Sequence, residues 1–438
     1  MTSQHPLARA LNQTYRTDRP VTSSATKPAT GTVAGLLRDI SSVGTDTRRG
    51  GYSRPVFSTA ETDLRSWFIE QAGGRGLDVT TDNNGIIWAW WDTATGTRRD
   101  AVVTGSHLDS VPGGGEYDGP LGVASALVAV DILKNRGIRP RRPLAIAVFP
   151  EEEGSRFGVA CLGSRLLTGA LDPNKARNLK DADGNTYADV AAANGQDPRF
   201  IGADHKTLQR LGLFVELHVE QGRGLIDLRR PVAIGSSILG HGRWKLSVRG
   251  QGNHAGTTLM KDRKDPMIAA AKIMIGIRDT ARNYKDARAT VGRLQPVPGG
   301  TNVIASRVDM WIDVRHPRDE VTAALVESIH LNAQVIAAEE RCTVTFDVES
   351  VSPTVHFDSG LRDQLQALIP GAPVLDTGAG HDAGVLAVHI PTAMLFVRNP
   401  TGISHSPEEL VEDHDAEAGA KALADVLEGL LGESRMTG

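Results

Sequence analysis

Short apolar runs alternate with a helical pattern in the first third of the chain. Residues 85–91 (GIIWAWW), 101–107 (AVVTGSH) and 143–150 (PLAIAVFP) have few polar interruptions, which is typical of strands that are buried on both faces. Between the last two runs, residues 122–137 (GVASALVAVDILKNRG) have apolar positions at helical spacing and end near a glycine. This strand–helix–strand order predicts an α/β domain with a mixed, mostly parallel sheet.

The pattern changes near residue 240. From there the sequence predicts the order strand, helix, strand, strand, helix, strand, at residues 243–250, 265–284, 289–297, 303–315, 318–340 and 342–350. This order is the split βαβ, ferredoxin-like arrangement. The α/β pattern then returns, in segments such as TAMLFV and DAEAGAKALADVLEGLLG. We therefore expect one discontinuous α/β domain, residues 31–240 and 351–438, with a ferredoxin-like α+β domain inserted at residues 241–350.

Length and composition agree with this division. A chain of 438 residues is too long for one ordinary core, and 40% hydrophobic with 23% charged residues is a normal globular composition. The net charge of -4 gives no reason to expect nucleic acid or an anionic membrane as a partner. No uninterrupted apolar run reaches the roughly 18–20 residues of a membrane span.

Residues 1–30 are polar and rich in Thr, Ser and Pro, and they lack the apolar segment of a secretory signal. We interpret them as a flexible N-terminal arm, with an organelle transit peptide as the alternative. Two cysteines, Cys161 and Cys342, are too few for a disulfide framework. A reducing, cytoplasmic location is therefore expected.

Histidines and carboxylates follow the ends of the predicted strands. They form four groups along the chain: His107 with Asp118, Glu152 with Glu153, His218, and His405. In a parallel sheet such strand ends converge in one crevice. Neutral imidazoles and carboxylates are ligands for zinc and neighbouring divalent metals.

Three histidines and three carboxylates exceed the needs of one tetrahedral ion. They fit two ions that share a bridging carboxylate, and such ions can lower the pKa of a water between them to about 7. A carboxylate beside the ions but not bound to them would then accept and return the proton. The neighbouring Glu152 and Glu153 can divide these two roles.

Eight motifs resemble one known family. In chain order they are GSHLDSVPGGGEYDGPLGV, EEEGSRF, ELHVEQG, NHAGTT, PGGTNVI, DVRHP, GAGHDA and GISHSPEE, spread from about residue 102 to 410. They resemble the amidohydrolase branch of the dinuclear aminoacylase/carboxypeptidase-like metallopeptidases. That branch contains N-carbamoyl-L-amino-acid hydrolases, β-ureidopropionases and allantoate amidohydrolases.

The resemblance implies how the matching residues bind metal. His107 and His405 would each be a terminal ligand on one ion, and Asp118 would be the bridging carboxylate. Glu153 and His218 would complete the two coordination shells. The implied cofactor is two divalent ions per subunit, with zinc expected and manganese, cobalt or nickel as alternatives.

The resemblance also implies catalytic groups. The Glu-Glu-Gly pattern of the family selects Glu152 as the general base and leaves Glu151 outside the site. Asp109 would accept a hydrogen bond from His107 and orient it. His254 would donate to the carbonyl oxygen of the scissile bond, where negative charge builds up.

Four further residues resemble substrate-binding groups: Asn302, Arg315, Gln221 and His381. The first two would hold the substrate carboxylate, for which the planar fork of arginine is suited, and the other two would be additional polar contacts. In relatives the inserted domain forms a homodimer and closes over the substrate. The dimer would bring His254 across from the partner chain.

We therefore expect a metal-dependent hydrolase of a small-molecule substrate, which cleaves the ureido C–N bond of N-carbamoyl-L-amino acids into amino acid, ammonia and carbon dioxide. Allantoate and carbamoyl-β-alanine are the alternative substrates within the family. The HVEQG and GHDA patterns disfavour an aminoacylase or dipeptidase. A non-catalytic ureide-binding protein would lack a ligand or the base, and none is missing from the motifs.

Overall fold

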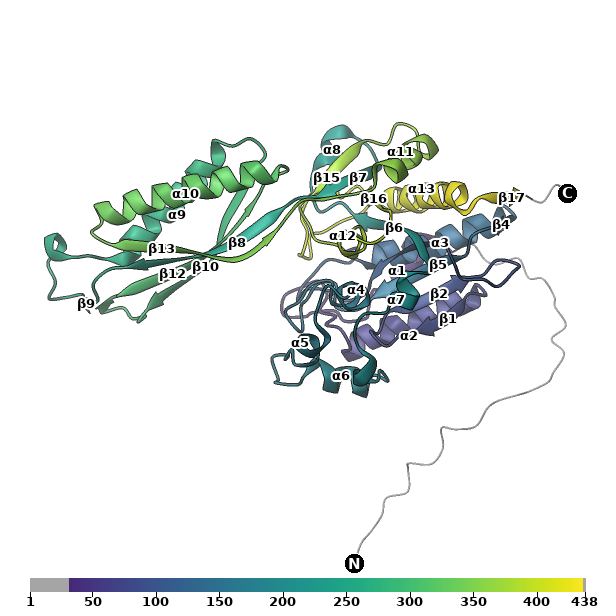
Figure 1. The fold of residues 1–438 in the computed structure, drawn as a ribbon, viewed down its shortest axis with the longest axis horizontal. Coiled ribbons are helices and arrows are strands. Elements are labelled where there is room, and N and C mark those ends of the chain that lie inside the picture. Colours follow the sequence, from purple (N-terminus) through teal and green to yellow (C-terminus); the bar gives the residue numbers. More distant parts are fainter. Residues whose placement is uncertain (1–30, 436–438) are drawn as a thin grey trace, which may run out of the picture.

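The chain folds into a large lobe and an elongated small lobe, which a narrow neck joins (Figure 1). The computed structural model describes residues 31–435. The predicted N-terminal arm, residues 1–30, lies outside the described residues.

A nine-stranded sheet forms the centre of the large lobe, in the order β1-β2-β5-β3-β6-β16-β7-β14, with β15 beside β7. Its strands are β1 (Asp78–Thr81), β2 (Ile87–Trp91), β3 (Ala101–His107), β5 (Leu144–Phe149), β6 (Leu211–Val219), β7 (Val232–Ile238), β14 (Val355–His356), β15 (Val374–Thr377) and β16 (Thr392–Val397). The central strands β5, β3, β6 and β16 run parallel, whereas β2 and β7 pair with β5 and β16 in the antiparallel sense. The predicted α/β class with a mixed, mostly parallel sheet is confirmed.

Burial on both faces explains the apolar runs of the sequence. Every residue of β3 and of β5 is buried, as expected for strands between two helical layers. Helix α3 (Pro120–Asn135) is buried along most of its length because it packs against the sheet and against the neighbouring helix α13 (Asp413–Leu431), which also contacts the sheet. Helix α1 (Val33–Asp39) packs beside both helices.

The remaining elements of the large lobe lie around this core. They are α2 (Thr59–Gly74), α4 (Leu162–Thr168), α5 (Pro173–Arg177), α6 (Tyr187–Ala193), the 3₁₀ helix η1 (Pro198–Phe200), α7 (His205–Leu208), α8 (Gly224–Leu228), α11 (Ser359–Leu368), α12 (Asp382–Leu386), and the paired strands β4 (Ile138–Pro140) and β17 (Glu433–Arg435). The sequence pattern does not predict the short helices from α4 to α7.

The small lobe has a four-stranded antiparallel sheet in the order β10-β12-β8-β13. Its elements are β8 (His241–Arg249), β9 (Asn253–His254), the 3₁₀ helix η2 (Met260–Asp262), α9 (Pro266–Arg282), β10 (Arg288–Val297), β11 (Val303–Ile304), β12 (Arg307–Arg315), α10 (Asp319–Glu339) and β13 (Thr343–Ser352). The predicted β-α-β-β-α-β order is present as β8-α9-β10-β12-α10-β13. The segment 303–315, predicted as one strand, is divided because β11 pairs with β9 while β12 pairs with β10 and β8.

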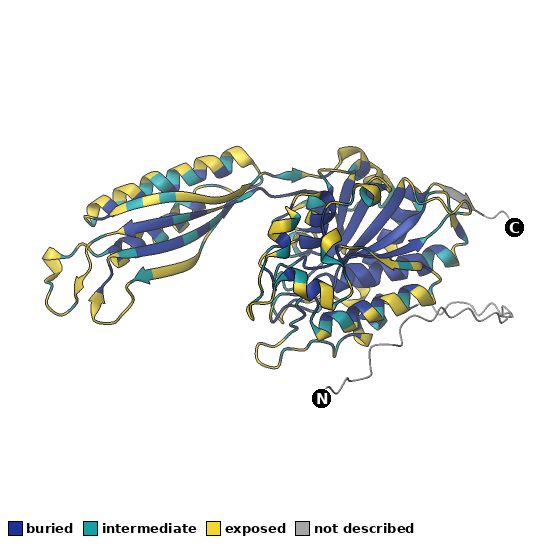
Figure 2. Ribbon diagram, turned by 60° about the horizontal axis from the view of Figure 1, so that its bottom comes forward, coloured by how far each residue is buried: buried dark blue, intermediate teal, exposed yellow. Residues whose placement is uncertain are grey.

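Helices α9 and α10 cover one face of the small sheet, and Figure 2 shows them with exposed outer sides. Their inner sides contribute Ile273, Ile277, Leu325 and Ile329 to a separate hydrophobic core. Among residues 31–435, α10 alone is long and apolar enough to cross a membrane by length and composition. In this fold its buried residues pack against β8, β12 and β13.

The neck consists of two segments that lie side by side. The first follows β7 and the second precedes β14, and Val355 of β14 pairs with Ile238 of β7. Gly240 N donates to Thr354 Oγ1 at 3.0 Å. The carboxylate of Asp319 accepts hydrogen bonds from Thr354 N at 3.0 Å and from Thr354 Oγ1 at 2.7 Å. The small lobe is therefore inserted between two adjacent strands of the large sheet.

Candidate metal centre

The polar residues that follow the strands gather at the carboxyl edge of the parallel sheet. His107 is the last residue of β3, and His218 is near the end of β6. Asp118 lies in the loop before α3, Glu153 follows β5, and His405 follows β16. These four strands are neighbours in the sheet, so their loops open into one crevice.

His107 and His218 form one group with the first carboxylate oxygen of Asp118. Their Nε2 atoms lie 3.5 and 3.3 Å from Asp118 Oδ1 and 3.5 Å from each other. His107 Nδ1 lies 2.9 Å from the main-chain oxygen of Asp109, and His218 Nδ1 lies 3.0 Å from that of Val219. Because a carbonyl oxygen only accepts, Nδ1 carries the hydrogen in both rings, and each Nε2 presents its lone pair toward Asp118.

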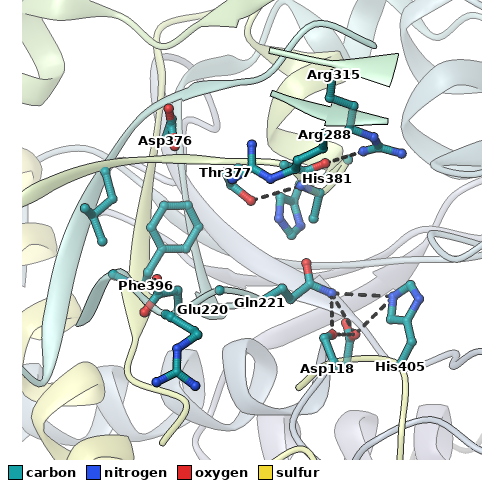
Figure 3. A pocket seen from close by; sticks show the side chains of 18 of the residues that line it. Asp118, Glu220, Gln221, Arg288, Arg315, Asp376, Thr377, His381, Phe396 and His405 are labelled. Atoms are coloured by element: carbon teal, nitrogen blue, oxygen red, sulfur yellow. Dashed lines mark hydrogen bonds and ion pairs between the residues drawn. The ribbon is translucent and has the colours of Figure 1, made fainter. Parts of the chain in front are cut away.

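Glu153 and His405 form a second group with the other oxygen of Asp118. His405 Nε2 lies 3.5 Å from Asp118 Oδ2 and 3.4 Å from Glu153 Oε2. Gln221 Nε2 donates to Asp118 Oδ2 at 2.9 Å and to Ser404 Oγ at 3.0 Å. Figure 3 shows Gln221, Asp118 and His405 converging at one end of the cavity. Asp118 therefore presents one oxygen to each group.

The two groups have the donor chemistry and the spacing of a divalent-metal pair. Ligand atoms around a tetrahedral ion with bonds of about 2.0–2.1 Å lie roughly 3.3–3.4 Å apart, and the contacts of Asp118 with His107 and His218 match this separation. Glu153 Oε1 is buried and makes no hydrogen bond within residues 31–435. These residues therefore fit two ions that share Asp118, one held by His107 and His218 and the other by Glu153 and His405.

The carboxylates of the site are crowded in a buried place. Burial raises the pKa of Glu152 well above its usual value, and it does the same to Glu153, where the charge of Asp118 adds to the effect. Burial acts to raise the pKa of Asp118 as well, yet the neighbouring His107 and His218 hold it well below the usual value. Full ionisation of this group needs nearby positive charge, which bound divalent ions would supply.

Asp109 accepts the expected hydrogen bond from His107, but through its main-chain oxygen rather than its carboxylate. His107 Nδ1 bonds to the main-chain oxygen of Asp109, and the carboxylate Oδ1 lies 3.7 Å from that nitrogen. The carboxylate instead accepts the main-chain N–H groups of Glu152 and Glu153, each at 3.1 Å. Asp109 therefore fixes the loop after β5 relative to the end of β3.

Glu152 lies beside the first ligand group without belonging to it. Its Oε2 is 3.7 Å from His107 Nε2, and Cys161 Sγ donates to its Oε1 at 3.6 Å. Its side chain also lines the cavity in front of the site. Glu151 lies outside both groups, because its Oε1 accepts the main-chain N–H groups of Arg156 and Phe157.

A cavity of about 920 Å³ opens in front of the two groups. The large lobe contributes three of the metal-ligand candidates, Asp118, Glu153 and His405, and the small lobe contributes four residues: Arg243, Asp286, Arg288 and Arg315. Its size suits a small molecule. The site is thus built where both lobes meet.

Gln221, His381 and Arg315 all line this cavity. Neither ring nitrogen of His381 has a hydrogen-bond partner in the part of the chain that the structure describes, and its ring centroid lies 4.5 Å from that of His218. Burial, with the neighbouring His218, lowers the pKa of His381 well below its usual value. Both ring nitrogens of His381 are therefore unpaired within residues 31–435, beside the ring of His218.

His254 and Asn302 lie away from the cavity. Strand β9, which carries His254, is at the far tip of the small lobe (Figure 1), and Ala255 N donates to the main-chain oxygen of Asn302 at 3.0 Å. Gly256 N donates to His254 Nδ1 at 3.1 Å, so the ring hydrogen is on Nε2. The structure brings these two residues together, but not to the metal-ligand groups of the same chain.

Sequence reasoning missed a buried glutamate that joins two of the site's loops. Glu409 Oε1 accepts the main-chain N–H groups of Tyr117 and Asp118 at 3.2 and 3.0 Å, and Ser404 Oγ donates to Glu409 Oε2 at 3.1 Å. Burial raises the pKa of Glu409 to about 7. The signal was its place in the GISHSPEE motif, four residues after His405.

Glu216 was missed as well. Its carboxylate accepts hydrogen bonds from Ser106 Oγ at 2.9 Å and from Ala383 N at 3.0 Å, and so links β6 to β3 and to the start of α12. A charged residue inside the apolar strand of the ELHVEQG motif was the signal that could have found it.

A mixed α/β sheet with two carboxylate-linked ligand groups at its edge defines a candidate two-metal enzyme. The model of peptidase family M20/M25/M40 matches residues 103–429, and the chain belongs to this family. The resemblance identified from the motifs is thereby confirmed.

Two relatives and one solved structure match this chain over most of both lengths. An N-carbamoyl-L-amino acid amidohydrolase of Geobacillus stearothermophilus is 35% identical over 380 residues, which is 85% of this chain and 92% of the relative. An allantoate amidohydrolase of Escherichia coli (strain K12) is 31% identical over 393 residues, 89% of this chain and 95% of the relative. The crystal structure of an amidase of the hydantoinase/carbamoylase family from Burkholderia multivorans has a TM-score of 0.81 at 29% identity, covering 91% of this chain and 97% of the other.

Proposed function

We propose that the protein is a metal-dependent hydrolase of the ureido C–N bond in N-carbamoyl-L-amino acids, which yields the amino acid, ammonia and carbon dioxide. The observation that carries the proposal is the placement of Asp118, whose two oxygens each face one ligand group, with Glu152 beside them. The substrate class is supported by the Geobacillus stearothermophilus relative, whose name specifies N-carbamoyl-L-amino acids.

Glu152 would move the protons of the reaction. Two divalent ions, zinc or else manganese, cobalt or nickel, would supply Lewis acidity and a water of lowered pKa when bound. Glu152 accepts a proton from the water that adds to the ureido carbon, and it returns the proton to the nitrogen that leaves as the C–N bond breaks.

Arg315 would bind the substrate carboxylate from the small lobe. Its Nε and Nη2 donate to Asp313 at 2.7 and 3.1 Å, and its Nη1 donates to the main-chain oxygen of Gly378 in the large lobe. Three of its five N–H groups are thus used, so two remain for a carboxylate. Gln221 and His381 would contact the ureido group on the opposite side of the cavity.

We propose a homodimer in which the small lobes pair. Five exposed apolar side chains lie on the two helices of this lobe: Met267, Ile268 and Ile275 on α9, and Leu331 and Val335 on α10. A second copy of the chain would remove this apolar surface from water. The two cysteines, both free and buried, suit a reducing, cytoplasmic location.

His254 and Asn302 would act on the site of the partner chain. Both residues sit at the exposed tip of the small lobe, far from the cavity of their own chain (Figure 1). The Nε2–H of His254 is free to donate to the ureido oxygen, where negative charge develops. One such donor lowers the barrier by about 2.7–4 kcal/mol.

Allantoate is the second candidate substrate, because the Escherichia coli relative is an allantoate amidohydrolase and covers 89% of this chain. Allantoate also carries a carboxylate near a ureido group, so Arg315 would serve both substrates.

A substrate panel tests the proposal. Purified protein, stripped of metal and reloaded with zinc or manganese, is assayed for ammonia and amine release from N-carbamoyl-L-amino acids, carbamoyl-β-alanine and allantoate. We expect turnover of the carbamoyl-L-amino acids and none of their D-enantiomers. If the metal-loaded protein releases no ammonia from any ureido compound, the proposal is wrong; preference for allantoate selects the second candidate.

A further inference from the structure

Three arginines of the small lobe face the cavity from one side of the sheet. Arg288, the first residue of β10, pairs directly with Arg315, the last residue of β12. Arg243 of β8 pairs with Asp313 of β12. Directly opposed residues share a face of the sheet, as do residues two apart on one strand. All four side chains therefore project from the same face, and the three arginines line the cavity.

Two of these arginines are already engaged by Asp313. Arg315 forms two hydrogen bonds with its carboxylate, and Arg243 Nε lies 3.5 Å from Asp313 Oδ2. The carboxylate of Asp313 forms no ion pair with Arg288. These four side chains thus carry three positive charges against one negative charge.

Arg288 is the arginine without a partner. Its side chain makes no hydrogen bond or ion pair with any residue in 31–435, and it is exposed. Four other carboxylates also line the cavity away from the metal-ligand groups, Glu220, Asp227, Asp286 and Asp376, but none of them forms an ion pair with Arg288. Figure 3 shows Arg288 next to Arg315 and across the cavity from Asp118 and His405. A ligand held between the metal groups and Arg315 would therefore have a free guanidinium beside it.

We propose that Arg288 binds a second carboxylate of the substrate, so that the enzyme prefers N-carbamoyl derivatives of acidic amino acids. This inference rests on the proposed ureido hydrolysis. Arg315 receives the carboxylate common to all substrates, and Arg288 receives the side-chain carboxylate. Directly opposed residues of an antiparallel pair have Cα atoms about 4.5–5.5 Å apart, which suits the short separation of the two carboxylates in aspartate or glutamate.

The test compares acids with amides of the same shape. The metal-loaded enzyme is assayed with N-carbamoyl-L-aspartate and -glutamate against N-carbamoyl-L-asparagine and -glutamine. Because a hydrogen bond between charged groups is worth more than one to a neutral amide, we expect the wild-type kcat/KM to favour the acids by about 10- to 100-fold. Arg288→Gln should reduce this ratio by the same factor, and Arg288→Glu should invert it.

Arg282→Gln is the matched control, because Arg282 lies on α9 outside the cavity and has only an exposed ion pair, at 3.8 Å, with Asp279. It should retain the wild-type ratio. An acid-to-amide ratio that Arg288→Gln leaves unchanged, including an equal loss on both substrates, overturns the inference while the proposed function stands. Absence of turnover with every ureido compound overturns the proposed function and this inference with it.

Discussion

Gly119 places the candidate metal ligand His107 under a close packing constraint. It lies between Asp118 and the first residue of α3 and has φ +87° and ψ −59°. A Cβ at this position would lie 2.6 Å from His107 Cε1, 2.6 Å from His107 Nδ1 and 2.7 Å from His107 O. The change Gly119→Ala must therefore displace the His107 ring from its position beside Asp118.

The expected cost has two parts. A side chain at this backbone conformation costs about 1–3 kcal/mol, and forcing a methyl group into packed surroundings costs about 1–3 kcal/mol more. We expect Gly119→Ala to lower the free energy of unfolding by roughly 2–6 kcal/mol in the metal-free protein. The displaced ring should also weaken metal binding by about 10- to 100-fold, the size of effect seen when the groups that orient a ligand are changed.

Gly137→Ala is the matched control at the other end of α3. Gly137 also has a positive φ, +72°, but nothing lies within 4 Å of a Cβ there, so only the backbone strain of about 1–2 kcal/mol applies. Urea unfolding with a chelator present measures the first effect, and metal content after dialysis measures the second. If Gly119→Ala loses no more stability than Gly137→Ala and retains the wild-type affinity for metal, the packing argument is refuted.

Four other outcomes are expected. Glu152→Gln should lower kcat by about 10²–10⁴-fold or more while metal content stays at the wild-type value; near-normal turnover would remove Glu152 as the base. Chelation should abolish turnover, and zinc, manganese, cobalt or nickel should restore it; turnover by metal-free protein would contradict the two-ion site. A mixture of inactive Glu152→Gln and His254→Ala chains, unfolded and refolded together, should regain about a quarter of the wild-type activity, because half of the pairs are mixed and each has one complete site; no recovery would place His254 outside the partner's site. Arg54→Met should destabilise the fold by about 1–3 kcal/mol in urea unfolding, because it leaves the carbonyl of Val43, which Arg54 bonds at 2.9 Å, without a donor and removes one of the two hydrogen bonds that the carbonyl of Ile40 accepts; an unchanged midpoint would show that water replaces those bonds.

The elements that the sequence predicted best are strands whose residues are all buried. Residues 101–107 form β3 with the expected bounds. Every residue of that strand is buried, and a short continuous apolar run is typical of a strand buried on both faces. Strands such as β1 and β15 were not predicted, since their residues are mostly exposed and carry no apolar pattern. The split between β11 and β12 arises because β11 pairs with β9 whereas β12 pairs with β8. The local sequence pattern does not predict which strands will pair.

In the candidate site, too, the sequence could not predict which atoms of a residue form its hydrogen bonds. The motif placed Asp109 two residues after His107, but spacing alone cannot distinguish a main-chain acceptor from a side-chain acceptor. In the structure the main-chain oxygen of Asp109 accepts the hydrogen bond from His107, and its carboxylate accepts those from the main-chain N–H groups of Glu152 and Glu153. Glu409 was missed for a related reason, since its partners are backbone groups almost 300 positions earlier, which no local pattern reveals.

The neck makes the small lobe an exchangeable module. Both of its ends emerge where Ile238 pairs with Val355, so a tight turn between these two residues would close β7 and β14 into a hairpin. All five candidate ligands, from His107 to His405, lie outside the stretch that such a turn would replace. Evolution, or an engineer, can therefore graft a different specificity lobe at this junction while the ion-holding sheet keeps its continuity.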